Sequence, residues 1–581
     1  MIVEPAPLVE PEDAEVPAPR SRSVVTEARV VFVASTIVYL ALAAVLVFRY
    51  DSVLGDAMSR VANAYYMLYS RDPKLAAVGF VWTPLPSIVL APFLPLKAIW
   101  PPLVTRGFLA NIESALLMAG SAVLLRGILA DLGLARLPRL TLVAVFVLNP
   151  MSLYYGANGM SEAMLLFFLL AAVLPLARWM RQPTPLHLVV AGLALGLGYL
   201  GRYEAIAPGL AATALVGAVS YRRGRRAGRE PHDARNLAVS DGTLIGVPVV
   251  FAFGLWAIAS WLIVGHPFDT FTSRYGNTAQ VSASRAGIAG AVGGTGLDVV
   301  PYLGRQLVAL APAFGIVLVF ALVVAWRRRD PWITAPIVVL GAVMGAQALT
   351  VASGGSFGWL RFQISAIPLT ALLVGYLLSP AWGRSSLRAK VAPSAPRRRV
   401  RSAGAALLAL VLTGAGSVTA LIAWSDPALA REEHAHVVPI ADRILGVHPW
   451  QRLTLGDLSG ERRVAAAIDR LAPGNGTVLV DVALGFPIVL ASSHPQQFVI
   501  TPDRDFPDAV ADPVGSGIRY ILVSRDTGTM DAVSAKYPDL YRSGAGFSRL
   551  AREFPSPYGN GRIWRLYRVF RPVSPSHGGN P

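Results

Sequence analysis

Apolar residues recur along most of the chain in long windows that short polar segments separate. Each window has roughly 17 to 25 residues, the length that a helix needs to cross about 30 Å of hydrocarbon while satisfying its own backbone hydrogen bonds. We therefore expect a polytopic α-helical membrane protein with about eleven transmembrane helices. They are predicted near residues 30–48, 107–125, 140–156, 161–178, 186–201, 205–220, 242–264, 305–326, 332–351, 362–380 and 403–424.

Residues 84–100 are also apolar, but prolines interrupt them at Pro84, Pro86, Pro92 and Pro95. Proline breaks a helix interior, and so short a segment suits a re-entrant or surface-lying stretch better than a full crossing. A crossing here would also invert every later loop. We therefore expect no span between the first two predicted helices.

Basic residues are concentrated in alternate loops, as the positive-inside rule requires of cytoplasmic loops. The clusters are Arg20, Arg22 and Arg29; Arg126, Arg136 and Arg139; Arg178 and Arg181; Arg222 to Arg235; Arg327 to Arg329; and Arg384 to Arg401. We therefore expect a multi-pass protein of the cell (inner or plasma) membrane with a cytoplasmic N-terminus and an external C-terminus. These loops also explain the formal net charge of +17, so we expect no nucleic-acid partner.

Composition supports the membrane assignment, because 54% hydrophobic and only 15% charged residues exceed what one soluble core could bury. The chain has no cysteine. Disulfides, thiolate catalysis and thiolate metal sites are thereby excluded.

Three regions are expected. Residues 1–28, rich in Pro, Glu and Ala at their start, are predicted to form a disordered cytoplasmic tail that is not a cleavable signal peptide. Residues 29–424 form the transmembrane module. Beyond residue 425 hydrophobicity falls, so 425–581 is predicted to be a water-soluble external domain.

This last region has the pattern of a small α/β domain. Helical spacing from Arg462 to Leu471 precedes predicted strands at Thr477–Val482, Phe498–Thr501 and Tyr520–Ser524. Four aspartates lie at strand ends or turns, where they either bind a metal or, more commonly, cap helices and form turns. They are Asp481, Asp503, Asp505 and Asp508.

The loop after the first predicted span carries the most informative acidic residues, Asp51 and Asp56. Residues 54–69 place apolar side chains at near-helical intervals, so Asp56 would begin an amphipathic helix along the external membrane face. An aspartate there is either a functional carboxylate or a cap that complements the helix dipole. The spacing alone leaves both roles open.

Several short motifs resemble the GT-C superfamily of membrane glycosyltransferases, which includes the protein O-mannosyltransferases and the aminoarabinose transferases of lipid A. The resemblance covers about residues 30–424. In the first external loop an acidic residue precedes an Ala/Tyr-containing helix and a proline-rich segment; two further matches lie in later spans. The motifs are Gly55-Asp56-Ala57 with Ala64-Tyr65-Tyr66 and Phe80 to Pro86; Asn149-Pro150 through Glu162-Ala163; and Gly196 to Glu204.

The resemblance implies an inverting glycosyltransferase that moves a sugar from a polyprenyl-phosphate donor to a cell-envelope glycan, lipid or protein on the external face. Asp56 would be the catalytic base, because attack by an acceptor hydroxyl needs a carboxylate to take its proton. Many relatives carry two adjacent acids where this chain has Asp56 followed by Ala57. The missing acid indicates either a different acceptor or the lack of a divalent ion, so a metal is possible but no metal or other cofactor is indicated, and Asp51 stays an alternative to the favoured Asp56.

Four residues at predicted external span ends are candidates for substrate binding together with Asp51. Arg202 and Arg361 would meet the charge that develops on the leaving lipid phosphate, with Glu162 and Glu204 beside them. The alternatives are ordinary: an arginine that extends to the headgroups, a solvated glutamate and a helix-capping glutamate.

Two observations bear on other functions. The loop from Gly265 to Val300 is rich in Gly and Ser, as a mobile loop over a lipid-donor cleft or a simple linker would be. A lipid-linked sugar transporter or flippase would show internal repeats and charges midway through spans, and neither is evident. That class and an inactive transferase-like scaffold remain the alternatives.

Overall fold

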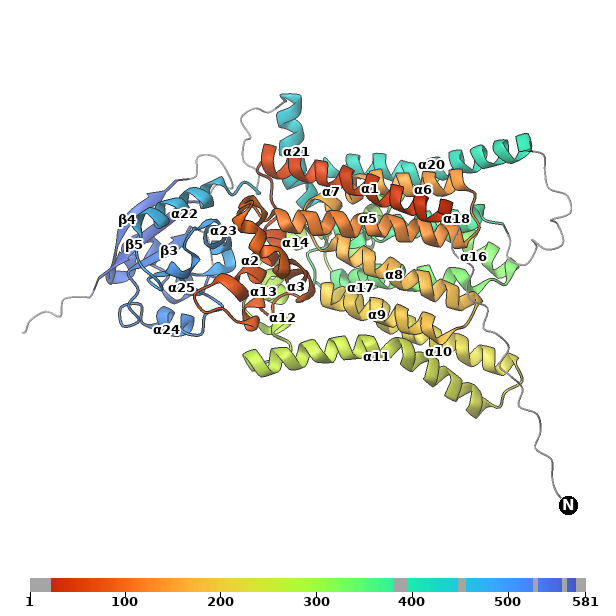
Figure 1. Cartoon of the computed structure of the whole chain (residues 1–581), viewed down its shortest axis with the longest axis horizontal. Coiled ribbons are helices and arrows are strands. Elements are labelled where there is room, and N and C mark those ends of the chain that lie inside the picture. The colour runs from red at the N-terminus through yellow and green to blue at the C-terminus, as the bar shows by residue number, and fades with distance from the viewer. Residues whose placement is uncertain (1–21, 381–394, 448–455, 526–530, 556–561, 571–581) are drawn as a thin grey trace, which may run out of the picture.

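The computed structural model describes residues 22–380, 395–447, 456–525, 531–555 and 562–570. It has a long helical bundle at one end and a smaller mixed domain at the other (Figure 1). The expected disordered tail lies mostly outside the described residues. Its last part does not: α1 (Arg22–Ala44) already includes residues 22–28, because Glu27 is held by Arg126 and Arg139, each at 2.8 Å.

Among the described residues, eight helices are long and apolar enough to cross a membrane, or up to ten if each of two bent pairs counts as one span. The chain is thus a multi-pass membrane protein. The eight spans are Val25–Arg49, which is α1 with the π-helical turn η1 (Val45–Arg49); Phe108–Asp131 (α5); Glu162–Arg181 (α8); Tyr203–Arg226 (η4 and α10); Pro231–Val264 (α11); Pro331–Ala352 (η6 and α17); Leu360–Leu378 (η7 and α18); and Arg399–Trp424, within α20 (Ala395–Trp424).

Two predicted spans are bent. One consists of α6 (Arg136–Leu148) and α7 (Pro150–Ala157), which meet at 58°. Pro150 starts α7 where its missing N–H is harmless, and the Asn149 side chain accepts a 3.0 Å hydrogen bond from the Met151 amide. The other comprises η5 (Gly296–Val299) with α15 (Val300–Leu310), followed by α16 (Phe314–Arg328) at 82°.

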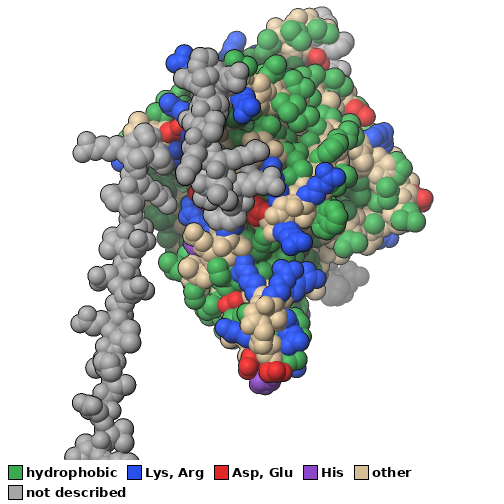
Figure 2. Space-filling model, turned by 90° about the vertical axis from the view of Figure 1, so that its right-hand side faces the viewer, with side chains coloured by type: hydrophobic (Ala, Val, Ile, Leu, Met, Phe, Trp, Pro, Cys, Tyr) green, Lys and Arg blue, Asp and Glu red, His purple; other side chains and the backbone are tan. Residues whose placement is uncertain are grey.

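The remaining predicted span, 186–201, is α9 (Pro185–Gly201), an apolar helix of 17 residues that is shorter than the others. Every predicted span therefore coincides with an apolar helix or a bent pair. Figure 2 shows Lys and Arg side chains gathered over the end of the bundle that faces away from the smaller domain. The cytoplasmic location of that end remains a prediction.

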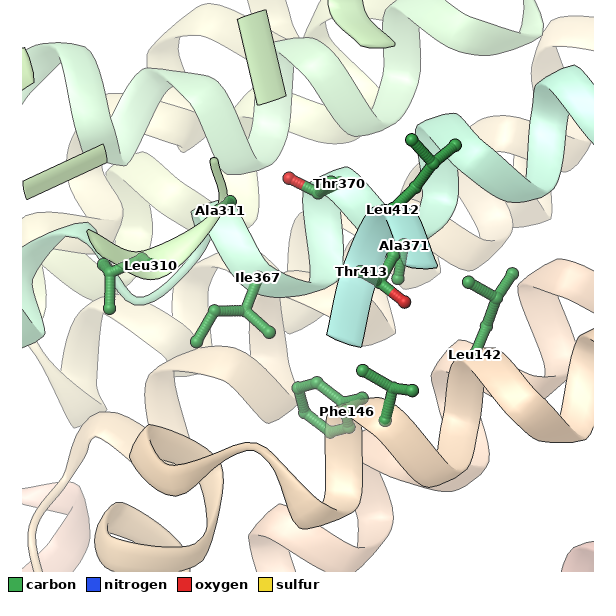
Figure 3. A pocket seen from close by; sticks show the side chains of 10 residues that line it. Leu142, Phe146, Leu310, Ala311, Ile367, Thr370, Ala371, Leu412 and Thr413 are labelled. Carbon is green, nitrogen blue, oxygen red and sulfur yellow. The ribbon is translucent and has the colours of Figure 1, made fainter. Parts of the chain in front are cut away.

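Inside the bundle, α6, α15, α18 and α20 surround a narrow cavity (Figure 3). Leu142 and Phe146 lie on one side, with Ile367, Ala371 and Leu412 across from them. Its described lining has no charged side chain, so it offers no group for acid–base chemistry.

The first loop folds into short helices. The predicted amphipathic helix is α2 (Gly55–Tyr69), with Val61, Ala64 and Tyr65 buried and Leu68 exposed. It is followed by η2 (Leu75–Val78), α3 (Leu85–Leu90), η3 (Ala91–Ala98) and α4 (Pro102–Thr105). None of these is long enough to cross a membrane, as the prolines predicted.

The loop after α11 is more ordered than its glycine and serine content predicted. It forms α12 (Asp269–Thr272), α13 (Asn277–Ala283) and α14 (Arg285–Val292). The Thr270 hydroxyl ties it to the first loop by donating a 2.6 Å hydrogen bond to the Phe80 carbonyl.

The C-terminal region begins with α21 (Arg431–Leu445) and α22 (Ser459–Leu471), and then forms a five-stranded sheet in the order β2-β1-β3-β5-β4. The three predicted strands are present as β1 (Val478–Val480), β2 (Phe498–Ile500) and β3 (Tyr520–Ser524), and they are parallel. The prediction missed β4 (Ser548–Phe554) and β5 (Trp564–Val569), an antiparallel pair rich in arginine. Helices α23 (Val482–Ala491), α24 (Phe506–Ala511), α25 (Ala532–Lys536) and α26 (Leu540–Ser543) complete the domain.

Ion pairs and hydrogen bonds join this domain to the first loop along a boundary that we call the seam. Arg462 on α22 binds Asp51 at 2.7 Å, and Arg504 binds Asp72 at 2.8 Å. The Tyr275 hydroxyl donates to Asp481 at 2.8 Å from the loop after α11. The short helices α2, α3, α13 and α14 lie between the bundle and the domain (Figure 1).

Candidate functional site

Asp56 lies in the first turn of α2 with its side chain 36% exposed. The N-cap residue is Leu54, whose side chain makes no capping hydrogen bond, and Asp56 lies in the first turn, where its charge also complements the helix dipole. Gly159 fixes the position of this turn from the neighbouring α7–α8 connection. It has a φ of +79°, and a Cβ there would lie 3.0 Å from the Cβ atoms of both Ala57 and Ala110.

A cavity opens beside Asp56. Side chains from six segments that are distant in sequence line it: α2, the proline-rich loop, the start of α8, the α9–η4 junction, α13 and the segment before α18. The lining consists of Asp56, Arg60, Trp82, Thr83, Ser161, Gly201, Arg202, Tyr203, Glu204, Asn277, Gln280, Phe357, Trp359, Arg361 and Phe362. Asn277 and Gln280 belong to the ordered loop after α11, so that loop forms part of the cavity wall.

Arg361 contacts more carboxylates than any other described residue lining this cavity. Its side chain is only 3% exposed and lies 4.1 Å from the centre of the Trp359 ring, which orients the guanidinium by a cation–π contact. Nε is 3.2 Å from Glu162 Oε1, Nη1 is 2.6 Å from Glu432 Oε1, and Nη2 is 3.8 Å from Asp56 Oδ2. One arginine thus contacts three carboxylates.

Arg202 occupies the next position, at the end of α9. It donates hydrogen bonds of 2.6 Å to both Glu162 Oε1 and Glu204 Oε1, and one of 3.1 Å to the Ser161 hydroxyl. Arg202 therefore does not extend to the headgroups. Carboxylates on both sides hold it, and its pKa stays above the usual value because they outweigh the opposing effect of burial.

The sequence prediction missed Glu432 and Glu433, which begin α21 just after the last span. The Tyr155 hydroxyl donates a 2.7 Å hydrogen bond to Glu433, and its oxygen also lies 3.0 Å from Glu432. Burial raises the pKa of Glu432 to about 8, while Arg361 opposes the rise. The signal available was two adjacent acids at the start of a helix, a pattern that also suits simple dipole complementarity.

Most charges around the cavity are paired with one another. Glu162, Glu204 and Glu432 each accept a hydrogen bond from Arg202 or Arg361. Among the described carboxylates of this cluster, Asp56 and Glu433 accept none from an arginine: Glu433 is bound by Tyr155, and Asp56 has only a 3.8 Å contact with Arg361. Of these two, Asp56 lines the cavity, beside the guanidinium groups of Arg202 and Arg361, an arrangement that suits general-base chemistry at a developing anion.

Asp51 lies elsewhere. Its Oδ1 is 3.0 Å from Arg106 Nη1 and 2.7 Å from Arg462 Nη2, and it is not among the lining residues. The structure thus brings together Asp56, Glu162, Arg202, Glu204 and Arg361, and it separates Asp51 from them. Asp51 binds the C-terminal domain at the seam.

In the part of the chain that the structure describes, no group of three His, Asp or Glu side chains could hold a metal ion. Asp481 caps α23 through the Ala483 amide at 2.8 Å. Asp503 and Asp505 both pair with Arg71, and burial raises the pKa of Asp503 to about 6. These aspartates therefore act as caps and ion-pair partners, while Asp508 lies in the first turn of α24.

Comparisons with known proteins give little. No protein-family model matches the chain, and no curated protein matches it. Among solved structures, the oligosaccharyltransferase of Archaeoglobus fulgidus in its apo form is similar over 89% of this chain and 72% of that one, with a TM-score of 0.44 and 10% identity.

Proposed function

We propose that this protein is a membrane glycosyltransferase that moves a sugar from a polyprenyl-phosphate donor to a cell-envelope glycan, lipid or protein on the external face of the membrane. The observation that carries the proposal is the convergence of Asp56, Arg202 and Arg361 on one open cavity beside the C-terminal domain. These residues come from three segments of the chain and share the site with the paired Glu162 and Glu204.

The reaction balances with the groups that the cavity supplies. An acceptor hydroxyl oxygen forms a bond to the anomeric carbon as the bond from that carbon to the phosphate oxygen breaks. The Asp56 carboxylate takes the hydroxyl proton. The polyprenyl phosphate leaves with the bonding electron pair, and Arg361 and Arg202 stabilise its charge. Because one displacement occurs, the anomeric configuration inverts.

Arg361 and Arg202 act in this proposal as an orienting pair. Both side chains are buried and paired with carboxylates. Their guanidinium groups are therefore fixed in position before a substrate enters. The Trp359 ring and the Tyr155–Glu432 contact hold Arg361 from the other side. The C-terminal domain, proposed to be external, would cover the acceptor side.

The test uses the full chain in lipid nanodiscs, supplied with a panel of radiolabelled polyprenyl-phosphate sugars and an envelope extract. A nanodisc has no enclosed compartment, so a flippase or transporter yields no labelled product there, whereas a transferase does. We expect label in the acceptor with the wild type and its loss in Asp56→Asn. Equal transfer by both would place the base elsewhere, and no transfer by either would favour the transporter or the inactive scaffold.

A further inference from the structure

A second cavity lies in the C-terminal domain, apart from the one around Asp56. Its walls come from α22 and from the antiparallel strands β4 and β5, with a volume of about 310 Å³ between them. We call it the arginine groove after the side chains among its described lining: Arg463 and Arg470 on α22, Arg552 on β4, and Arg562 just before β5. Strands β4 and β5 form the end of the molecule furthest from the bundle (Figure 1).

The arginine groove has a large excess of positive charge. Glu553 is the single acidic residue in its described lining, and Arg565 already binds that carboxylate at 2.7 Å. Arg562 lies 3.9 Å from Glu461, whereas Arg463, Arg470 and Arg552 have no carboxylate partner among the described residues. Cations that converge on one space without counter-charges repel one another, and an anion that enters the space relieves the repulsion.

The spacing of the arginines indicates an extended ligand. Arg463 and Arg470 are seven residues apart on α22, which places them on the same face. At 1.5 Å per residue their backbones are separated by about 10 Å. Drawing both guanidinium groups onto one small anion would bring like charges together, whereas anionic groups spaced along a chain can pair with each arginine separately, so the matching ligand carries several anionic groups along a chain.

Helix α22 presents this face while its other side is occupied. Arg462 turns to Asp51 at the seam, and buried Val464 and Ile468 pack into the domain. Buried Trp564 supports the groove from below, and its indole donates to Glu461 at 3.3 Å. Half-buried Phe554 lies beneath the Arg552 guanidinium, 5.1 Å from the ring centre. Guanidinium groups bind carboxylate or phosphate in a fork.

We propose that the arginine groove binds an anionic glycan, a sugar chain bearing several carboxylate or phosphate groups. The polyanionic character follows from the groove itself. The choice of a glycan rests on the proposed sugar transfer, since a transferase acting on such a chain gains from a second contact with it.

The test measures binding to the full chain in nanodiscs of neutral phosphatidylcholine, with no sugar donor present. The probe is an oligogalacturonate, and the comparison ligands are a neutral dextran oligosaccharide, polyglutamate, inorganic phosphate and vesicles of phosphatidylglycerol. We expect oligogalacturonate to bind best, with an affinity that falls as salt rises. Inorganic phosphate should compete only weakly, since it reaches one arginine at a time.

The variants localise the binding. Arg463→Gln with Arg470→Gln should weaken oligogalacturonate binding by about tenfold or more. Arg542→Gln with Arg568→Gln removes the same charge from exposed positions of the same domain outside the groove lining, and should change it by less than about twofold. Should the first pair fail to fold, Arg552→Gln on exposed β4 is the second variant, with a weakening that again exceeds the control.

Each contrary result overturns the proposal. Equal weakening by both pairs would reflect net charge alone, and tight dextran binding would show that charge is irrelevant. Preference for polyglutamate would indicate an acidic peptide, preference for phosphatidylglycerol a lipid surface, and phosphate binding as strong as oligogalacturonate binding a single-anion site. Because no donor is present, failure here leaves the transfer by Asp56 intact, and loss of transfer in Asp56→Asn leaves this binding unchanged.

Discussion

The cavity around Asp56 and the seam around Asp51 both consist of arginines and carboxylates, yet their charges are arranged differently. At the seam, Asp51 lies within 3.0 Å of two arginines and Asp72 within 2.8 Å of one. In the cavity, Arg202 and Arg361 are divided among Glu162, Glu204 and Glu432, and Asp56 has only a 3.8 Å contact. Paired carboxylates hold structure, and the carboxylate without a close partner is the one available for chemistry.

The largest expected effect separates these two aspartates. Asp56→Asn should reduce sugar transfer by about 10²- to 10⁴-fold, the usual contribution of a general base. Asp51→Asn should leave transfer within a few-fold of the wild type, because Asp51 does not line the cavity. Single-turnover transfer with saturating donor measures both. The reverse order of effects would assign the chemistry to the seam and contradict the proposed mechanism.

The next largest effect concerns Arg361. Arg361→Met keeps much of the side-chain volume but leaves Glu432 without its arginine partner, while Glu162 keeps only Arg202. Removing one partner of a buried ion pair destabilises by about 3–5 kcal/mol, and we expect the free energy of unfolding to fall by that amount. Chemical unfolding in detergent, followed by tryptophan fluorescence, measures it. A loss below about 1 kcal/mol would mean that water reaches these carboxylates.

A smaller effect is expected at His436, which lies on α21 between the cavity and the seam. Its side chain is 8% exposed, and burial lowers its pKa from 6.5 to about 4, with Asp56 opposing and Arg361 reinforcing the shift. The unfolded chain therefore binds a proton between pH 6.5 and 4 that the folded chain does not, and stability falls as pH falls through that window. The loss is up to about 3 kcal/mol.

The variant that isolates this contribution is His436→Gln, compared with the wild type from pH 7 to pH 5 by thermal unfolding. The melting temperature of the wild type should fall further over this range than that of the variant, because the carboxylates titrate in both proteins. Parallel curves would show that His436 is accessible to protons in the folded state.

The positions of the spans in the bundle could be predicted from the sequence, because hydrophobic spacing is a local property. Every predicted span coincides with an apolar helix or a bent pair, and α2 lies where its spacing predicted. Strands β4 and β5 could not be predicted in the same way. Each of these strands carries two arginines, which interrupt the alternation of apolar and polar residues, and the edge strand β4 is mostly exposed.

The site illustrates the same limit. Asp56 and Arg202 could be singled out by resemblance and Arg361 by its place at a predicted span end, but their proximity depends on the packing of segments from residue 56 to residue 432. Glu432 and Glu433 follow the last span and carry no motif, so only the fold shows that Glu432 reaches Arg361 and Glu433 reaches Tyr155. Likewise, only the fold separates Asp51 from Asp56, two carboxylates five residues apart in one loop.

The smallest expected effect is at the exposed end of the seam, where Arg504 binds Asp72 with its own side chain 81% exposed. Water and salt screen such a pair, and Lys74 remains 2.6 Å from Asp72 when the arginine is removed. Arg504→Met should therefore leave the unfolding midpoint unchanged within error at physiological salt, measured beside Arg361→Met under the same conditions. A shift as large as that of Arg361→Met would show that losing a cation at the seam destabilises the protein as much as losing one at the cavity. The lack of a close arginine partner would then no longer distinguish Asp56 from the carboxylates that only join the two regions.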